Sequence, residues 1–367
     1  MRNRYLDLIR ALAIIRVVVY HATTWAFLTI VFPAMSVMFA LAGSLMAATL
    51  DRVGGVRAIG RRLRRLLPSL WALAAVFVPA MLLTGLSLDW RLLYWLLPLG
   101  DPPSNSWGAL ALSQIWYLRD YLWFVLVSPL ALPLFRRAPL PTLLAPYALL
   151  VLVEFGPLTV HHIVRDFGLY FGAWLLGFAH HDGLLRRMPR RLLIGIAGTA
   201  AVLGGAWILT HPGPRGFDIN DIRLGNALWS LAFILLLLGL APTRADWVDR
   251  NRFLSRAVTV LNQRALTIYL WHMPLVLAVL TITAPFGLYR PSWDALAVQV
   301  PLLFLLVAVA VLLVGWVEDV AAGRRLALIP GRRRPAARGG RIPAPRAQVE
   351  SPAAQRASAD EVNARAR

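Results

Sequence analysis

Four ionisable side chains lie within one long apolar segment near the start of the chain. The stretch RYLDLIRALAIIRVVVYHATTW, residues 4–25, contains Asp7, Arg10, Arg16 and His21. Arginine donates hydrogen bonds to oxygen atoms and pairs with carboxylates, whereas histidine gains or loses a proton near neutral pH. These residue types could form a working polar site, or they could only hold helices together.

Helical spacing predicts that three of these four side chains share one face. Arg10 and His21 are eleven residues apart. On an α-helix this spacing puts the two side chains within about 20° of each other around the axis and about 16 Å apart along it. Asp7 lies on the same stripe, whereas Arg16 is about 120° away from Arg10. A mid-span arginine or aspartate costs roughly 2.5–3.5 kcal/mol on insertion scales, so we expect the stripe to face a polar cavity inside a bundle. The alternative is that Asp7 and Arg10 form a structural ion pair between helices, while His21 is a histidine whose hydrogen bonds are satisfied at the interface. This alternative explains the same spacing.

The composition predicts an all-α, polytopic membrane helix bundle. The 367 residues are 58% hydrophobic and 15% charged, whereas soluble domains are about 25% charged. Segment 89–100 is apolar but too short to cross, so we expect it at the interface or folded back. Ten segments have the length of transmembrane helices, at about residues 5–30, 33–50, 67–86, 114–135, 141–157, 165–181, 191–210, 224–241, 257–284 and 296–317.

The distribution of arginine predicts the orientation of these spans. The net charge is +20, and every basic residue is arginine. With the N-terminus inside, the inner links up to residue 256 hold 18 arginines and the outer links hold 6. The positive-inside rule then predicts an N-in, C-in protein of the plasma or inner membrane. Because the arginines cluster beside apolar segments, we expect them to meet the lipid bilayer and not nucleic acid.

Two regions differ sharply in composition. Residues 1–317 form the predicted membrane domain, and residues 318–367, rich in Arg, Pro, Ala and Gly, form a predicted disordered basic cytoplasmic tail. The first segment is expected to be retained, because charges interrupt its apolar core. The chain has no cysteine, which excludes thiolate chemistry. The pairs His161-His162 and His180-His181 lack the spacing of a bidentate metal site, and we predict no metal.

Several motifs in order resemble the acyltransferase-3 family of integral membrane O-acyltransferases. The stretch LDLIRALAIIRVVVYHA is similar to the family's first span, with an arginine and a histidine separated by ten residues. Further similar stretches are VMFALAGSLMAATL, RRLRRLLPSLW, IWYLRDYLWFVLVSPL and LTIYLWHMPLV. The resemblance covers about residues 4–317. Ala42 stands where the family usually has serine, and Arg16 is an additional charge that the family pattern does not explain.

The resemblance implies transfer of an acyl group, usually acetyl, from acyl-CoA to a hydroxyl, often on a sugar. Such O-acetylation modifies a carbohydrate and needs acyl-CoA as a co-substrate, without a permanently bound cofactor. His21 would act as the general base on the acceptor hydroxyl. Arg10 would bind the phosphates of acyl-CoA or polarise its thioester carbonyl, and Asp7 would orient Arg10. Direct transfer is simpler here than a covalent acyl-enzyme, although an acyl-histidine stays open.

Other residues are candidates for substrate contacts. His272 would be a second acid/base or an acceptor ligand beside Tyr269, although a packed, helix-joining histidine fits equally. Trp116 and Arg119 would contact a sugar acceptor, while Trp116 also fits the interfacial aromatic belt. A cluster of arginines would attract the nucleotide end of acyl-CoA, or would serve only to set the orientation of the chain in the membrane. Its members are Arg61, Arg62, Arg64 and Arg65.

Two other classes of function use the same residues differently. A secondary transporter or flippase would use the stripe of Asp7, Arg10 and His21 as a proton or substrate path. The chain shows no internal repeat, which disfavours a transporter built from duplicated halves. A scaffold or sensor would need the stripe only for stability. The expected partners of the enzyme are acyl-CoA and a hydroxyl-bearing glycan or glycolipid, and the sequence does not specify the acceptor, the acyl length or the oligomeric state.

Overall fold

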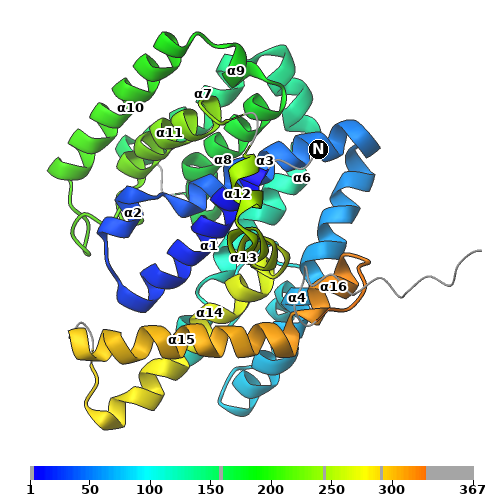
Figure 1. The fold of residues 1–367 in the computed structure, drawn as a ribbon, viewed down its shortest axis with the longest axis vertical. Helices are drawn as coiled ribbons and strands as arrows, with labels where there is room; N and C mark the ends of the chain where they lie inside the picture. Colours follow the sequence, from blue (N-terminus) through cyan, green and yellow to red (C-terminus); the bar gives the residue numbers. More distant parts are fainter. Residues whose placement is uncertain (1–3, 157–159, 243–244, 290–291, 328–367) are drawn as a thin grey trace, which may run out of the picture. The chain divides into compact units, whose positions relative to one another are not determined.

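The computed structural model describes residues 4–156, 160–242, 245–289 and 292–327, and these are mostly helical (Figure 1). No β-strand occurs in these ranges, which confirms the predicted all-α class. The α-helices are α1 (Arg4–Thr23), α2 (Phe27–Val31), α3 (Ala34–Val53), α4 (Gly55–Leu83), α5 (Ser106–Ala111), α6 (Ile115–Arg137), α7 (Pro139–Phe155), α8 (His162–His181), α9 (Leu184–Arg187), α10 (Arg190–Thr210), α11 (Arg223–Gly239), α12 (Asp246–Arg250), α13 (Arg252–Gln263), α14 (Ala265–Thr283), α15 (Trp293–Val314) and α16 (Trp316–Ala321). Two 3₁₀ helices are η1 (Trp90–Trp95) and η2 (Ala284–Phe286).

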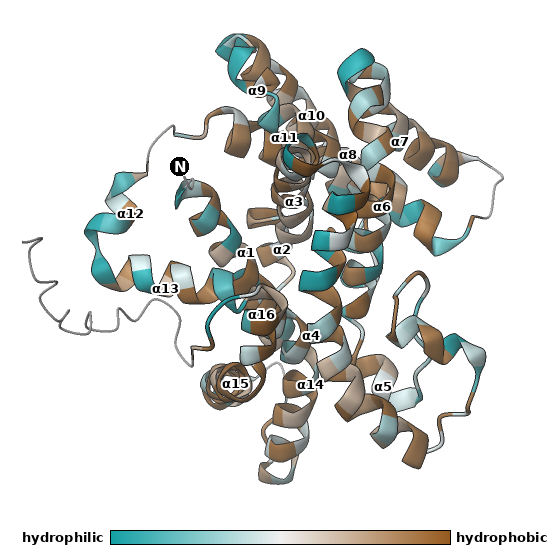
Figure 2. Ribbon diagram, turned by 90° about the vertical axis from the view of Figure 1, so that its right-hand side faces the viewer, coloured by the Kyte–Doolittle hydropathy of each residue, from teal (hydrophilic) through white to brown (hydrophobic). Residues whose placement is uncertain are grey.

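Several of these helices are long and apolar enough to cross a membrane. Within the described residues, six segments meet this criterion: Phe27–Val53, Gly55–Leu83, Ile115–Arg137, Arg190–Thr210, Ala265–Phe286 and Trp293–Val314. Apolar residues predominate on α10, α11 and α15, and hydrophilic residues are frequent on α12 and α13 (Figure 2). The chain is therefore a membrane protein with several apolar helices. The count of ten spans and the N-in, C-in orientation stay predictions.

Helix α1 ends earlier than the sequence predicted. We expected one span to about residue 30, but the helix stops at Thr23, and Thr24 has a φ of 59°. This left-handed conformation is uncommon for residues other than glycine and interrupts the helix. The chain then re-forms short helix α2 before α3 begins. The interruption places His21 in the last turn of α1.

The apolar faces of α1 fix its position between several other helices. Helix α1 packs against α3, α13, α14 and α15. Ile14, Val18 and Ala22 of α1 are buried in a cluster with residues of α14 and α15. On another side, Ile9, Ala13 and Val17 join the largest buried cluster, which includes much of α3. This packing holds the polar side chains of α1 inside the bundle.

Helices α3 and α8 approach closely because glycines lie at their contact. A Cβ atom at Gly43 would overlap the backbone oxygen of Trp174, and one at Gly177 would overlap that of Ala40. Small residues let helix backbones come together in this way in membrane bundles. Helix α8 is thereby fixed against α3, and the same helix carries Asp166 and Tyr170.

The beginning of the predicted tail belongs to the helical body. We placed the tail boundary at residue 318, but Glu318 and Asp319 lie in α16. Glu318 accepts hydrogen bonds from the amide and hydroxyl of Thr267, and Asp319 accepts one from Arg264 at 2.7 Å. Burial raises the pKa of Glu318. These contacts order residues that composition alone assigns to a solvated tail, and residues 328–367 lie outside the described part of the chain.

Candidate active site

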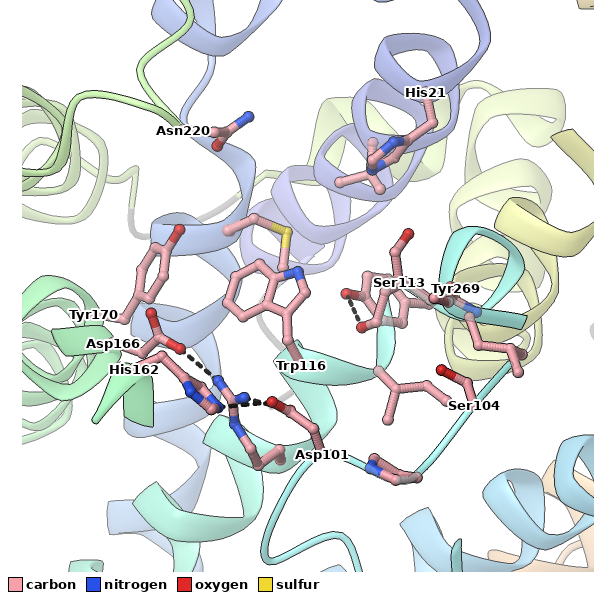
Figure 3. Close-up of a pocket in the computed structure, with 18 of the residues that line it drawn as sticks. His21, Asp101, Ser104, Ser113, Trp116, His162, Asp166, Tyr170, Asn220 and Tyr269 are labelled. Atoms are coloured by element: carbon pink, nitrogen blue, oxygen red, sulfur yellow. Dashed lines mark hydrogen bonds and ion pairs between the residues drawn. The ribbon is translucent and has the colours of Figure 1, made fainter. Parts of the chain in front are cut away.

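A cavity of about 660 Å³ contains His21 and most of the predicted acceptor residues. Its walls come from α1, α3, α6, α8, α11, α14 and two connecting segments, residues 84–114 and 211–222. His21, Trp116, Tyr170, Ser113 and Tyr269 lie around this space in Figure 3. The volume and the mixture of aromatic and polar side chains suit a small polar molecule such as a sugar.

His21 and His272 form a contacting pair from two helices. Their ring centroids are 5.1 Å apart. His272 is fully buried, and its Nδ1 lies 2.6 Å from the carbonyl oxygen of Tyr269. A carbonyl only accepts, so Nδ1 carries the proton and Nε2 is an acceptor. Among the described residues, Nε2 of His272 has no hydrogen-bond partner.

Tyr269 connects the start of α6 to α14 at the edge of this cavity. Its hydroxyl donates to the carbonyl of Gln114 at 2.9 Å, and the Gln114 amide donates to the carbonyl of Leu270 at 2.6 Å. Trp116, two residues after Gln114, stacks on Tyr170 with ring centroids 5.3 Å apart. The structure therefore brings Tyr269 and Trp116 to the His21 cavity, and their contact with a substrate stays a prediction.

Arg119 lines the same cavity but is already surrounded by acidic groups. Its side chain is 2% exposed and pairs with Asp120 at 2.8 Å, and also with Asp101 and Asp166. Nε2 of His162 lies 2.6 Å from the second oxygen of Asp101. Arg119 thus joins α6, α8 and the 84–114 connection. These pairs occupy the guanidinium, and its contact with a sugar stays a prediction.

Asp7 and Arg10 lie outside the set of residues that line the His21 cavity. Asn262 of α13 links them, because Arg10 donates to its side-chain oxygen at 3.3 Å and its amide donates to the Asp7 carbonyl at 2.7 Å. The Asp7 carboxylate also lies 3.9 Å from the guanidinium of Arg4. The predicted stripe is therefore divided along α1, with His21 in one cavity and the other two residues beside α13. A catalytic role for Asp7 or Arg10 stays a prediction.

A second cavity, of about 560 Å³, gathers the predicted donor residues. Val320–Gly323 form part of its wall. Arg62 donates to the hydroxyl of Thr49 at 3.1 Å. The arginines that line this second cavity are Arg52, Arg61, Arg62, Arg64 and Arg65. The structure thus brings Arg61, Arg64 and Arg65 together in a space that suits an anion, while their role in binding acyl-CoA stays a prediction.

Sequence reasoning missed the segment between α10 and α11. Arg215 and Asn220 of this segment line the His21 cavity. Arg215 donates to the hydroxyl of Tyr20 at 2.7 Å and pairs with Asp221 at 2.6 Å. The hydrogen bond to Asp221 raises the pKa of Arg215, and the pKa of Asp221 is lowered by the same contact. Arg16 also lines the cavity. Its unusual position within an apolar segment was the only feature of the sequence that pointed to any of these additional cavity residues.

One acidic group resembles a metal site but is already occupied by arginine. Ligand atoms of Asp51, His181 and Asp182 lie within 4.8 Å of one another. Arg136 pairs with Asp51 at 2.8 Å and with Asp182 at 2.7 Å. Since the guanidinium binds both carboxylates, this group serves to join α3, α6 and the end of α8.

Comparison with known proteins identifies the family. A family model described as an acyltransferase domain matches residues 3–317, which is most of the chain. Comparisons with curated proteins and with solved structures found no match. The match covers α1 to α15. It includes the residues that line both cavities, except Val320–Gly323 of the second cavity. The chain is therefore a membrane acyltransferase that belongs to the acyltransferase-3 family.

Proposed function

We propose that the chain transfers an acyl group, with acetyl as the first choice, from acyl-CoA to a hydroxyl of a sugar-containing or lipid-linked acceptor. The observation that carries this proposal is the position of His21 in the larger cavity of a chain whose family transfers acyl groups. Family membership favours this activity over the transporter, which would use the same polar residues.

In this proposal His21 is the general base. It takes the proton of the acceptor hydroxyl while the oxygen attacks the thioester carbonyl carbon. A C–O bond forms, the C–S bond breaks, and the proton finally resides on the sulfur of free coenzyme A. His272, with a 5.1 Å ring-to-ring separation, supports the position of the His21 ring. No covalent acyl-enzyme is needed.

The arginine-lined cavity supports the choice of donor. Acyl-CoA carries several phosphate charges, and arginine binds phosphate through paired, charge-assisted hydrogen bonds. In this proposal Arg10, which donates to Asn262 of α13 at 3.3 Å, binds the phosphates of the donor or polarises its thioester carbonyl. With the N-terminus inside, the donor enters from the cytoplasm and the acceptor from the opposite side.

The experiment compares purified protein in detergent with its His21→Gln variant. Release of free coenzyme A from acetyl-CoA is followed with a panel of sugar acceptors, and thermal unfolding is measured in parallel. We expect His21→Gln to fold normally and to lower kcat at least about 100-fold, since a positioned general base contributes about 10²–10⁴. Arg256→Gln changes an exposed arginine of α13 that lines neither cavity and serves as the control.

The outcomes separate the alternatives. A folded His21→Gln variant with the turnover of the wild type would show that His21 is not the base. A wild-type protein that consumes no acyl-CoA with any acceptor would favour the transporter. Loss of thermal stability together with turnover would favour a structural role for His21.

A further inference from the structure

Four arginines line the His21 cavity, and three of them are paired with carboxylates. Arg119 pairs with Asp101, Asp120 and Asp166. Arg215 pairs with Asp221 at 2.6 Å and lies 3.5 Å from Asp218. Arg223 lies 3.6 Å from Glu154. Their charges are therefore locally balanced.

Arg16 differs from these three because no carboxylate contacts it within the described residues. Its Nε donates to the carbonyl of Leu28 at 3.0 Å, and its guanidinium lies 5.0 Å from the ring centre of Tyr20. The charge of Asp218 acts on Arg16 from a distance, without a direct contact. The Asp218 carboxylate instead accepts the hydrogen bond of the Tyr20 hydroxyl and faces Arg215. The Nη groups of Arg16 find no acceptor in the described part of the chain.

An unbalanced arginine on an apolar helix is costly and marks a place where a partner is expected. The acidic side chains that reach this cavity do not supply that partner. Asp101 and Asp166 line the cavity, but both are held by Arg119. Arg16 also lines a small recess of about 10 Å³ beside Asn220.

We propose that Arg16 binds an oxyanion, a carboxylate or phosphate, carried by the acceptor itself, and so determines which acceptors are used. This inference rests on the proposed function and names the substrate class. Arg16 and His21 are five residues apart on α1, about 7.5 Å along the helix axis. The two side chains also differ by about 140° around the helix, so the acceptor places its anionic group at least about one sugar unit away from the hydroxyl that His21 deprotonates. Stacking on Trp116 holds the ring between them.

The expected effect is a preference for the charged member of a matched acceptor pair. A hydrogen bond to a charged group contributes about 1.5–3 kcal/mol, which corresponds to about 10- to 150-fold in kcat/KM. In Arg16→Gln this preference disappears, because kcat/KM falls more for the anionic member of each pair than for the neutral one. The variant should fold, because it removes a charge that has no carboxylate contact in the described structure.

The experiment uses the full chain in lipid-free detergent and three matched pairs of probes. These are methyl glucoside with methyl glucuronide, methyl galactoside with methyl galacturonide, and glycerol with glycerol 3-phosphate. Release of coenzyme A from acetyl-CoA and the shift in melting temperature are measured for wild type, Arg16→Gln and Arg256→Gln. A second arm places the protein in nanodiscs of phosphatidylcholine with or without phosphatidylglycerol, because a lipid headgroup carries the same oxyanion.

Each outcome decides the proposal. A preference of at least about 10-fold for an anionic probe, lost in Arg16→Gln and kept in Arg256→Gln, supports a soluble anionic acceptor. Stabilisation only by phosphatidylglycerol, lost in Arg16→Gln, assigns the oxyanion to a lipid headgroup. Stabilisation by an anionic probe without any release of coenzyme A keeps the anion site and contradicts the proposed transfer from acetyl-CoA. Equal behaviour of charged and neutral probes in wild type and Arg16→Gln shows that the anion proposal is wrong.

Discussion

At the scale of single residues, charge pairing decides which arginines are available for a substrate. Arg119 and Arg16 line the same cavity, but Arg119 has three carboxylate partners and Arg16 has none among the described residues. A buried arginine that is paired on all sides braces the helices and contributes little to recognition. A half-buried arginine that lines a cavity, as Arg16 does, can meet an incoming group. The two residues therefore have different consequences when they are changed.

Arg119→Gln is expected to destabilise the protein strongly. The change leaves Asp120, which is 1% exposed, without its charge partner. Removing one member of a buried ion pair costs about 3–5 kcal/mol, because the other charge stays buried. Thermal unfolding in detergent measures this loss.

The double variant Arg119→Gln/Asp120→Asn tests the reason for that loss. Neutralising Asp120 removes the buried unpaired charge. The double variant should therefore lose less stability than the sum of the losses in the two single variants. Arg256→Gln should unfold like the wild type. An Arg119→Gln variant with an unchanged melting temperature would contradict the bracing role.

At the scale of helices, the contact between α3 and α8 depends on the absence of side chains. Gly177→Ala would place a Cβ atom against the Ala40 carbonyl and 2.6 Å from the Ser44 amide nitrogen. Overpacking of this kind costs about 1–3 kcal/mol, and we expect a clear drop in melting temperature. Since α8 carries Tyr170 and Asp166, we expect reduced turnover as well.

Gly195→Ala is the matched control for this prediction. Gly195 lies within α10, and a Cβ there meets no atom within 4 Å. Alanine is favoured over glycine in helix interiors by about 1 kcal/mol, so this variant should be as stable as the wild type or more stable. Equal stability of Gly177→Ala and Gly195→Ala would show that close backbone packing at Gly177 is unimportant.

The sequence predicts the helices better than the contacts between them. Apolar runs of helical length predict most spans, and the eleven-residue spacing places His21 on the same face as Arg10. The end of α1 at Thr23 could not be predicted, because no glycine or proline near Thr24 marks its left-handed φ. The partners of Arg119 come from positions 101, 120 and 166, which only the folded chain brings together. Arg16 attracted notice in the sequence as an unexplained charge, but its lack of a carboxylate contact required the structure.

At the scale of the whole molecule, we propose that the two cavities separate two tasks. One contains His21 and aromatic side chains, and the other is lined by five arginines and residues beside α16. They share no lining residue. If acyl-CoA occupies the arginine-lined cavity and the acceptor occupies the other, the two substrates should respond independently to changes in each cavity.

Arg61→Gln/Arg65→Gln is therefore expected to raise the KM for acetyl-CoA about 10-fold and to leave the KM for the acceptor unchanged. The loss follows from removing two charges that face the phosphates, each of which contributes a charge-assisted hydrogen bond. Added salt should raise the KM of the wild type for acetyl-CoA and affect the double variant less, because salt screens charges near the surface. Initial rates at varied acetyl-CoA and fixed acceptor, and then the reverse, measure both constants. An unchanged KM for acetyl-CoA in a folded double variant would show that these arginines serve topology alone and that the donor binds elsewhere.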